Sequence, residues 1–517
     1  MKSSEHRAVG HAATGGALVQ VGGDAAEERF TLSYGDMVAL SGDFFASHDS
    51  RSHAVNGSHA EPEYVPSDDL FQLAAIPGKC GTQPGTRDEI ICALKVMAVD
   101  GDFVDSRFEP GGQFSDFRFT ATAAATKVER RVRDRFLTLA TANGDHFVAP
   151  GRPDTTHDHN GPRSSRFDSA VIAYRRLHEV ALDEACRLGR CQHDESRAMA
   201  REAAAQHYLT DAFAAGHLRT PVTAIRHFWH HRYPGFWQSL QCKVAADTAA
   251  ALRQLTRPAR ILPDDFLYDR AHAAVKARTR RYPPITFGDL LARVFHDWDD
   301  SHGLTLQGGG ILFGDGHLDD GVGKQLAITA ARAGIDDIDI AYRLGASGSR
   351  LHGPALYRAV RSATGGANDA FTPETLIPTP SADNPPQNWR ATDAEALWSS
   401  PIVGTTGTTV GTAVEQTLRL GTEVSRRLDR LGPGVFELPG LLGIPPLRRW
   451  ATRKARQAYH HGFIQDLAHD PKATVLTIVN NEAGSCPDAT TKIEHRGQSK
   501  IQAREDAEAT PTPHSGS

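Results

Sequence analysis

Apolar residues recur at helical spacing through most of the first half of the chain. The spacing predicts a short helix within residues 30–45, opened by Ser33 or Asp36. It also predicts longer helices, rich in Ala, Leu, Arg and Glu, over 87–99, 121–143, 166–188, 193–216 and 236–257. Glycine and proline cluster between these segments, at 150–163 and 217–235. We therefore expect an all-α bundle in this half.

The pattern changes after Thr286. A helical stretch at 287–298 is followed by short alternating runs with glycines, which predict a small β-hairpin near 303–318. Helical spacing returns at 321–335, 412–431 and 446–467, and the Pro/Thr/Gly/Ser-rich stretch 365–411 is typical of a linker. The expected fold is mainly α, divided into a flexible N-terminal segment 1–28, a helical domain 29–335 with the hairpin, a helical C-terminal extension 336–485 and a disordered tail 486–517.

Composition narrows the class of protein. Apolar residues make up 40% and charged residues 23% of the 517 residues, as in ordinary globular proteins. The net charge of −5 argues against a nucleic-acid binder that works by neutralising phosphates, so nucleic acid is expected only as a substrate. The sequence has no apolar run long enough for a membrane span and no secretory signal. We expect a cytoplasmic protein, or one exported without a classical signal peptide.

Histidine is the unusual residue type, with 25 copies, which raises the expectation of a metal site. The six cysteines include no CxxC pair and are interpreted as ordinary thiols, although Cys80/Cys92 and Cys186/Cys191 could each form a disulfide. His178 lies on an apolar-faced helix and is interpreted as a packed residue.

The strongest candidate for chemistry is the segment from His207 through Asp211 to His217. His207 and Asp211 are four residues apart, which places them on one helix face about 6 Å from each other, close enough to share a metal. Gly216 is expected to end the helix and to free His217 for a second metal. Imidazole and carboxylate ligands suit zinc. An ordinary polar pair on a solvated helix face is the alternative interpretation.

His-x3-Asp-x5-His is also the motif of the zinc-dependent phospholipase C / S1–P1 nuclease superfamily, and the chain resembles a bacterial branch of it over roughly residues 30–320. A second motif of that superfamily, a His followed by an aromatic residue, matches Asp145-His146-Phe147, about 60 residues upstream. The resemblance implies the phospholipase C/P1 nuclease fold and makes residues 29–335 a metal-dependent hydrolase domain.

The resemblance also implies a set of ligands for two or three Zn²⁺ ions. His146 and His207 would bind one zinc together with an Asp, for which Asp134 is the nearest counterpart, and Asp211 would bridge to a second. His217 would bind a further ion, completed by His296 and Asp300, with Asp299 as a close competitor. The cluster of His227, His230 and His231 is an alternative to His296.

The chain departs from the superfamily at its beginning. The secreted enzymes use the amine and carbonyl of an N-terminal Trp as ligands, whereas this sequence starts at Met1 and has no Trp before Trp229. Asp36 and Asp43 are the candidates to replace that ligand, and Asp43 is also the candidate general base. A helix cap for Asp36 and a surface carboxylate for Asp43 are the alternatives.

The implied function is zinc-dependent hydrolysis of phosphoric esters by a metal-activated water. We favour a phospholipase C-like activity on a phosphodiester such as a phospholipid head group. The alternatives are a P1-like single-strand nuclease and a non-catalytic helical binding protein with a degenerate metal site. Arg219 could contact the phosphate, although a surface Arg is the commoner interpretation.

Overall fold

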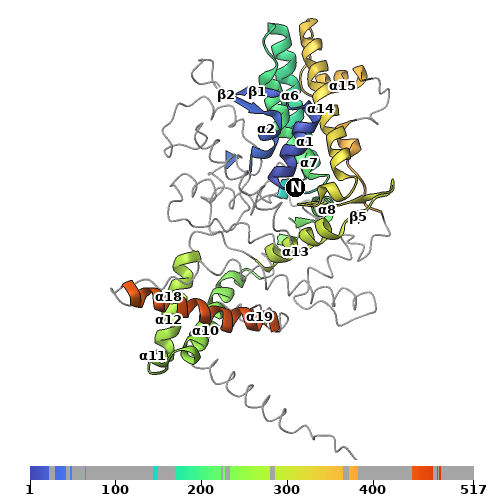
Figure 1. The fold of residues 1–517 in the computed structure, drawn as a ribbon. Coiled ribbons are helices and arrows are strands. Elements are labelled where there is room, and N and C mark those ends of the chain that lie inside the picture. The colour runs from blue at the N-terminus through green and yellow to red at the C-terminus, as the bar shows by residue number, and fades with distance from the viewer. Residues whose placement is uncertain are drawn as a thin grey trace, which may run out of the picture. The chain divides into compact units, whose positions relative to one another are not determined.

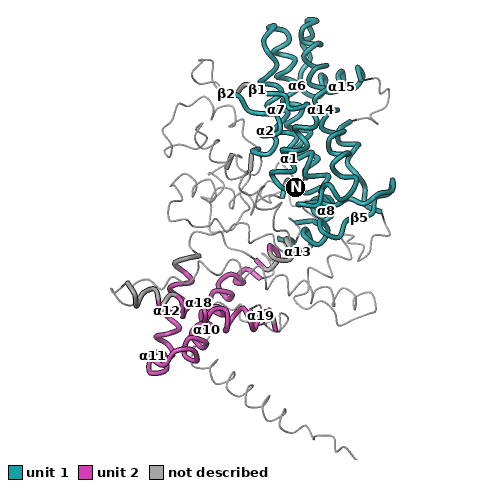
Figure 2. The backbone as a smooth tube through the Cα atoms, in the orientation of Figure 1, with its two compact units in different colours: residues 1–227, 292–395 teal, residues 228–291, 396–517 magenta. Residues whose placement is uncertain are grey.

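The computed structural model describes residues 1–21, 30–41, 47–48, 64–65, 144–148, 169–222, 225–226, 233–279, 286–364, 372–381, 445–469, 474 and 477–478. These residues are mainly helical, as expected from the sequence. The chain forms two compact units, Met1–His227 with Ala292–Glu395 and Phe228–Leu291 with Ala396–Ser517 (Figure 2). No helix among these residues is long and apolar enough to cross a membrane.

Unit 1 is built around three long helices, α6, α7 and α14, which pack against one another (Figure 1). Two shorter N-terminal helices, α1 and α2, pack on each other and on α7. The bounds of the helices in this unit are α1 Ser3–Thr14, α2 Tyr34–Leu40, α6 Ala170–Cys191, α7 Ser196–Asp211, α8 Ala215–Arg219, α13 Phe287–His302 (which begins in unit 2), α14 Gly323–Ala346 and α15 Gly353–Ala363.

Glycine allows α6 and α14 to approach closely. A Cβ added at Gly189 of α6 would meet the backbone of Tyr342, and one added at Gly345 of α14 would meet the backbone of Cys186. The apolar core beside this crossing includes Ala185 of α6, Ala198 of α7 and Ala341 of α14. Small side chains at the crossing therefore hold α7, the helix with the His207–Asp211 pair, in a tightly packed bundle.

Among the described residues, the strands form three two-stranded antiparallel sheets. β1 (Leu18–Val21) pairs with β2 (Phe30–Ser33), in a register that sets Leu18 opposite Ser33. β3 (Ser47–His48) pairs with β4 (Tyr64–Val65), and β5 (Leu304–Thr305) pairs with β6 (Ile311–Leu312). The last pair is the hairpin expected near 303–318. Short 3-10 turns occur at η4 (Gly144–His146), η5 (Leu318–Asp320) and η6 (Pro373–Leu376).

Unit 2 is a smaller helical body in which α10 (Phe236–Leu255) packs against α12 (Asp264–Thr279) and α18 (Pro445–Tyr459). α11 (Arg257–Arg260) connects α10 to α12, while a π-helical turn, η8 (His460–Ile464), connects α18 to α19 (Gln465–His469). Its core includes Ala245, Ala249, Leu267 and Ala271 from α10 and α12.

Two expected boundaries differ from the structure. Residues 1–21 are not a flexible segment, because α1 and β1 occupy them and the side chains of Met1 and Val9 are part of the core of unit 1. The expected boundary at 335/336 lies inside the continuous helix α14. Both errors come from Gly- and Ala-rich stretches, whose weak periodicity does not show how they pack.

The remaining expectations are met in part. The helices expected over 166–188, 193–216, 236–257, 287–298, 321–335 and 446–467 correspond to α6, α7 with α8, α10, α13, α14 and α18 to α19. The segments 87–99, 121–143, 412–431 and 486–517 and most of the expected linker 365–411 lie outside the described residues.

The cysteines differ from one another. Cys186 and Cys191 are both free thiols, so they do not form the disulfide that their spacing allowed. Cys242 is disulfide-bonded, so the interpretation of all six as ordinary thiols is wrong for that residue.

Candidate metal centre

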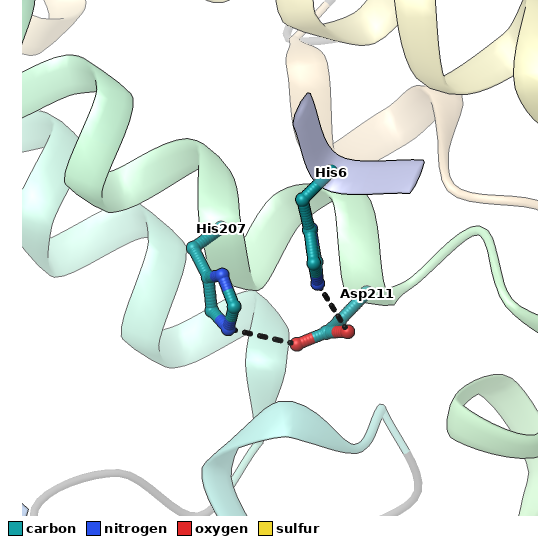
Figure 3. A group of neighbouring side chains, drawn as sticks. All are labelled: His6, His207 and Asp211. Carbon is teal, nitrogen blue, oxygen red and sulfur yellow. Dashed lines mark ion pairs between the residues drawn. The ribbon is translucent and has the colours of Figure 1, made fainter. Parts of the chain in front are cut away.

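Helix α7 presents His207 and Asp211 to the interior, and both side chains are fully buried. His207 Nε2 lies 3.6 Å from Asp211 Oδ2. On the other side of the same carboxylate, His6 of α1 places its Nε2 3.3 Å from Asp211 Oδ1. Figure 3 shows the two imidazoles directed at opposite oxygens of Asp211. The three side chains form a group whose ligand atoms could hold one metal ion.

His146, on the short turn η4, joins this group. Its Nδ1 lies 2.8 Å from Asp211 Oδ2 and 3.3 Å from His207 Nε2. The sequence predicted that His146 and His207 share a metal, and the structure brings the two rings together although 61 residues separate them.

His217 lies on the separate short helix α8. Helix α7 ends at Asp211, earlier than Gly216, and the chain turns through residues 212–214 before α8 begins. His217 Nδ1 lies 2.9 Å from the carbonyl oxygen of His146 and 3.5 Å from Asp211 Oδ1. The turn that redirects His217 is therefore at 212–214, and Gly216 has a different role.

Gly216 brings α8 against α13. A Cβ at this position would lie 2.5 Å from the carbonyl oxygen of His296 and 2.9 Å from Asp300 Oδ1. Its backbone N–H also donates to Asp300 Oδ1, at 2.7 Å. Only glycine leaves room for this approach, which sets His217 beside the acidic end of α13.

His296 and Asp300 of α13 form a second group, at the i and i+4 spacing seen in α7. His296 Nε2 lies 3.2 Å from Asp300 Oδ2, and its Nδ1 lies 2.8 Å from Asp297 Oδ1. Asp315, in the loop after the hairpin, has its Oδ2 3.8 Å from His296 Nε2. Its φ of 21° is unusual for a residue with a Cβ and marks strain at this loop. His217, His296 and Asp315 could hold a second ion.

The amine of Met1 lies between the two groups. It donates to Asp211 Oδ1 at 2.7 Å, contacts His217 Nε2 at 2.7 Å and lies 3.1 Å from Asp315 Oδ1. Burial by itself would lower the pKa of this amine, but the surrounding carboxylates, Asp211 first, raise it to about 11.

Hydrogen bonds outside the cluster orient its imidazoles. His207 Nδ1 faces the carbonyl oxygen of Val38 at 2.9 Å, and His217 Nδ1 faces that of His146. A carbonyl only accepts, so each ring donates from Nδ1 and turns the lone pair of Nε2 inward. His6 Nδ1 lies 2.7 Å from the hydroxyl of Thr210, which itself donates to backbone carbonyls. This arrangement of the partners around metal-binding histidines is common in proteins.

The directions of the pKa shifts agree with imidazoles that carry their proton on Nδ1 alone. Burial, helped by His6, holds the pKa of His207 well below its ordinary value. Burial and the Met1 ammonium do the same for His217. Burial would raise the pKa of Asp211, but the Met1 ammonium and His217 outweigh it and keep the carboxyl ionised. His207 and His217 are therefore neutral and Asp211 is ionised, which are the protonation states that bind a metal.

The residues of both groups could hold metal ions. A neutral His207 turns a lone pair toward the carboxylate of Asp211, an arrangement that a cation between them would stabilise. His6 Nε2 and Asp300 Oδ2 are buried and have no hydrogen-bond partner, although each lies near another ligand atom. Imidazole nitrogens and carboxylate oxygens make up both groups, and such donors suit transition metal ions better than calcium or magnesium.

Three other residues considered from the sequence have different partners. Asp36 lies outside these groups: it accepts from the hydroxyl of Ser33, the N-cap of α2, and pairs with Arg7 at 2.7 Å. Asp299 pairs with Arg219, and both side chains are buried. The expectation of a surface Arg219 is therefore wrong, and this pair turns its guanidinium toward α13. Asp43, Asp134 and the cluster of His227, His230 and His231 lie outside the described residues.

His6, Asp297 and Asp315 were missed from the sequence. His6 lies in the segment expected to be flexible, where its helical spacing with Val9 and Gly10, all buried, was the available signal. Asp297 is adjacent to His296 and could have been proposed as its partner. Asp315 belongs to a Gly- and Asp-rich turn, and no local pattern connects it with His296.

The chain was compared with known protein families, sequences and structures. No protein-family model, curated protein sequence or solved structure matches the chain.

Proposed function

We propose that this chain is a zinc-dependent phosphoric ester hydrolase of phospholipase C-like activity. The observation that carries the proposal is the convergence of four imidazoles, from His6, His146, His207 and His217, on the single buried carboxylate of Asp211. Beside it lies a second His/Asp group on α13. Phosphodiester hydrolysis commonly uses two neighbouring metal ions, which polarise the phosphate and lower the pKa of a bound water to about 7.

Asp211 would bridge two ions. Its Oδ2 faces His146 and His207, while its Oδ1 faces His6 and His217. A carboxylate whose two oxygens face different sets of imidazoles can serve two ions at once. Its full burial keeps both oxygens away from bulk water and strengthens their interaction with cations.

The α13 group would supply the remaining ligands. His296 and Asp300 follow the spacing of the superfamily's third site, and Asp297 accepts from His296 Nδ1, which leaves His296 Nε2 directed at Asp300. Phe147 stacks on His217, with ring centroids 4.6 Å apart, and meets the edge of His296. Phe147 therefore packs against both His217 and His296 and restricts the orientation of the two rings.

A lipid and a nucleic-acid phosphodiester need the same metal ligands, so the choice of substrate rests on charge. The net charge of −5 disfavours a polyanionic substrate, which supports the phospholipid over single-stranded DNA. A P1-like nuclease activity is the second candidate.

The test combines zinc analysis with a substrate panel. Full-length protein purified with zinc is assayed on phosphatidylcholine and on single-stranded DNA, and its metal content is measured. We expect two or three zinc ions per chain and release of the phosphorylated head group. His207→Ala and Asp211→Ala should each reduce hydrolysis to background, because each removes a ligand. His193→Ala, at an exposed histidine after α6, should change neither quantity.

Three outcomes would contradict the proposal. Fewer than one zinc per chain would favour the non-catalytic binding protein. Cleavage of DNA without cleavage of lipid would favour the P1-like nuclease activity over the phospholipase C-like activity. Full activity in His207→Ala would show that the site is elsewhere.

A further inference from the structure

The outward face of α18 in unit 2 is basic. The helix Pro445–Tyr459 contains five Lys or Arg residues and no Asp or Glu, and the first acidic residue after it is Asp466. Arg453 and Arg456 are exposed and Lys454 is half-buried. Within the described residues, none of these three side chains forms an ion pair with a carboxylate. No carboxylate among the residues that the structure describes therefore neutralises the positive charge of this face.

The opposite face of α18 is buried against α10. Ala455, Ala458 and Tyr459 are buried, and α18 packs on α10. In the following turn, a Cβ at Gly462 would meet the backbone of Asp247 in α10, so the helix lies directly on its neighbour. The helix is thus held with its apolar side against α10 and its basic side outward.

An exposed aromatic residue belongs to the same outward face. Trp450 is 43% exposed, and Arg453, Lys454 and Gln457 follow it at the i+3, i+4 and i+7 positions of one helical stripe. An exposed Trp beside Lys and Arg is the composition typical of segments that contact the surface of a bilayer, where the indole lies among head groups.

The geometry excludes one common partner of basic helices and disfavours another. A protein groove that takes up an amphipathic helix binds its apolar face, and here that face is already covered by α10. Nucleic acid would also match the charge, but the chain as a whole carries −5, which opposes a long polyanion. A membrane surface needs only a local basic patch near it, because its potential decays within about one Debye length.

We propose that the surface formed by Trp450, Arg453, Lys454, Arg456 and Gln457 docks unit 2 onto an anionic phospholipid bilayer. The cations approach the phosphate and carboxylate groups of the lipids, and the indole of Trp450 enters the head-group layer. This docking does not depend on the proposed hydrolysis, since it uses residues of the other unit and requires no metal.

The test is flotation of the full-length protein with vesicles of phosphatidylcholine alone or with about 30% phosphatidylserine. Binding is expected only to the anionic vesicles and should weaken at high salt. The variant Arg453→Gln/Lys454→Gln/Arg456→Gln should bind about 100-fold more weakly, since each cation near the surface contributes about fivefold. Trp450→Ala should weaken binding without changing its salt dependence.

A matched control separates the surface from net charge. Arg257→Gln/Arg270→Gln/Lys276→Gln removes the same number of charges from exposed positions on α11 and α12 and should bind normally. Equal loss in both triple variants, or no preference for anionic vesicles, would overturn the proposal. Binding of single-stranded DNA through Arg453, Lys454 and Arg456 in place of vesicles would overturn it as well. Head-group release is measured in parallel, so a chain that binds without hydrolysing contradicts only the proposed function.

Discussion

The described part of unit 1 contains two buried clusters of histidines and carboxylates that use side chains of α7. One is the candidate metal centre around His207 and Asp211. The other joins His178 of α6 to Glu202 of α7 and Asp337 of α14, at 2.6 Å and 3.3 Å, and is completed by Arg361 of α15, which pairs with Asp337. Both clusters combine buried histidines with carboxylates, but the hydrogen-bond partners of their histidines differ.

In the second cluster the cations are the ring of His178 and the guanidinium of Arg361. The two nitrogens of His178 face different carboxylates, so both can donate. Burial lowers the pKa of His178, but Glu202 and Asp337 outweigh burial and raise it to about 10. Together with Arg361, the imidazolium balances the two carboxylates. In the metal centre, by contrast, the pKa values of His207 and His217 lie well below the ordinary value.

The comparison teaches how to tell a metal site from a buried salt-bridge network. In the network of His178, both ring nitrogens face carboxylates of other helices, and the pKa of the ring is raised. A metal site directs one nitrogen of each ring to an outside acceptor and turns the other lone pairs toward a common centre. By this criterion His178 belongs to a network, in agreement with its interpretation as a packed residue.

The largest expected difference is between Asp211→Asn and Asp337→Asn. We expect Asp211→Asn to lose at least one zinc ion and to reduce hydrolysis to background. Asp337→Asn should keep its zinc but lower the free energy of unfolding by about 3–5 kcal/mol, since it leaves a buried cation without its partner. Elemental analysis and urea unfolding measure the two effects. Loss of zinc in Asp337→Asn would show that the two clusters depend on each other and would contradict the distinction between them.

The second cluster should also respond to pH. The folded-state pKa of His178, about 10, lies above its ordinary value of 6.5, so its stabilisation is complete below pH 6.5 and is lost as the pH rises toward 10. The loss should amount to roughly 3–5 kcal/mol. Urea unfolding between pH 6.5 and pH 10 should show this decline in the wild type and a flatter profile in His178→Gln. Parallel profiles would mean that His178 is neutral in the folded protein.

A smaller effect is expected at Thr210, whose hydroxyl faces His6 Nδ1. Thr210→Val should lower zinc affinity by roughly 10–100-fold, because it removes the group that orients His6 without removing a ligand. Thr329→Val is the control, since that exposed threonine on α14 also donates to a carbonyl one helical turn before it. Competition with a zinc chelator measures the affinity, and an unchanged value in Thr210→Val would remove His6 from the ligand set.

The smallest expected effect concerns the contact between α8 and α13. Gly216→Ala should destabilise the fold by about 1–3 kcal/mol, because its Cβ would displace His296 and Asp300. It should also weaken zinc binding at the α13 group. Gly308→Ala, where a Cβ would meet nothing within 4 Å, should change neither. Thermal unfolding and zinc titration compare the variants, and equal behaviour of the two would argue against a close approach at Gly216.

Much of unit 1 could be predicted from local periodicity. The spacing of apolar residues predicted α6, α7, α13 and most of α14, because a helix that buries one face must repeat apolar positions at its own pitch. The N-terminal helix α1 could not be predicted in the same way. Its small residues give little contrast between faces, and its burial depends on α2, α7 and α14.

Part of the candidate site could likewise be predicted from local spacing, and part could not. The sequence by itself determined that His207 and Asp211 share a helix face, and that His296 and Asp300 do, since the pitch of a helix fixes side chains four residues apart. Only the tertiary structure decided that His6 and Asp315 join them and that Arg361 closes the network of His178. These meetings bridge long separations along the chain, and they follow from the packing of whole helices, which no short pattern of residues encodes.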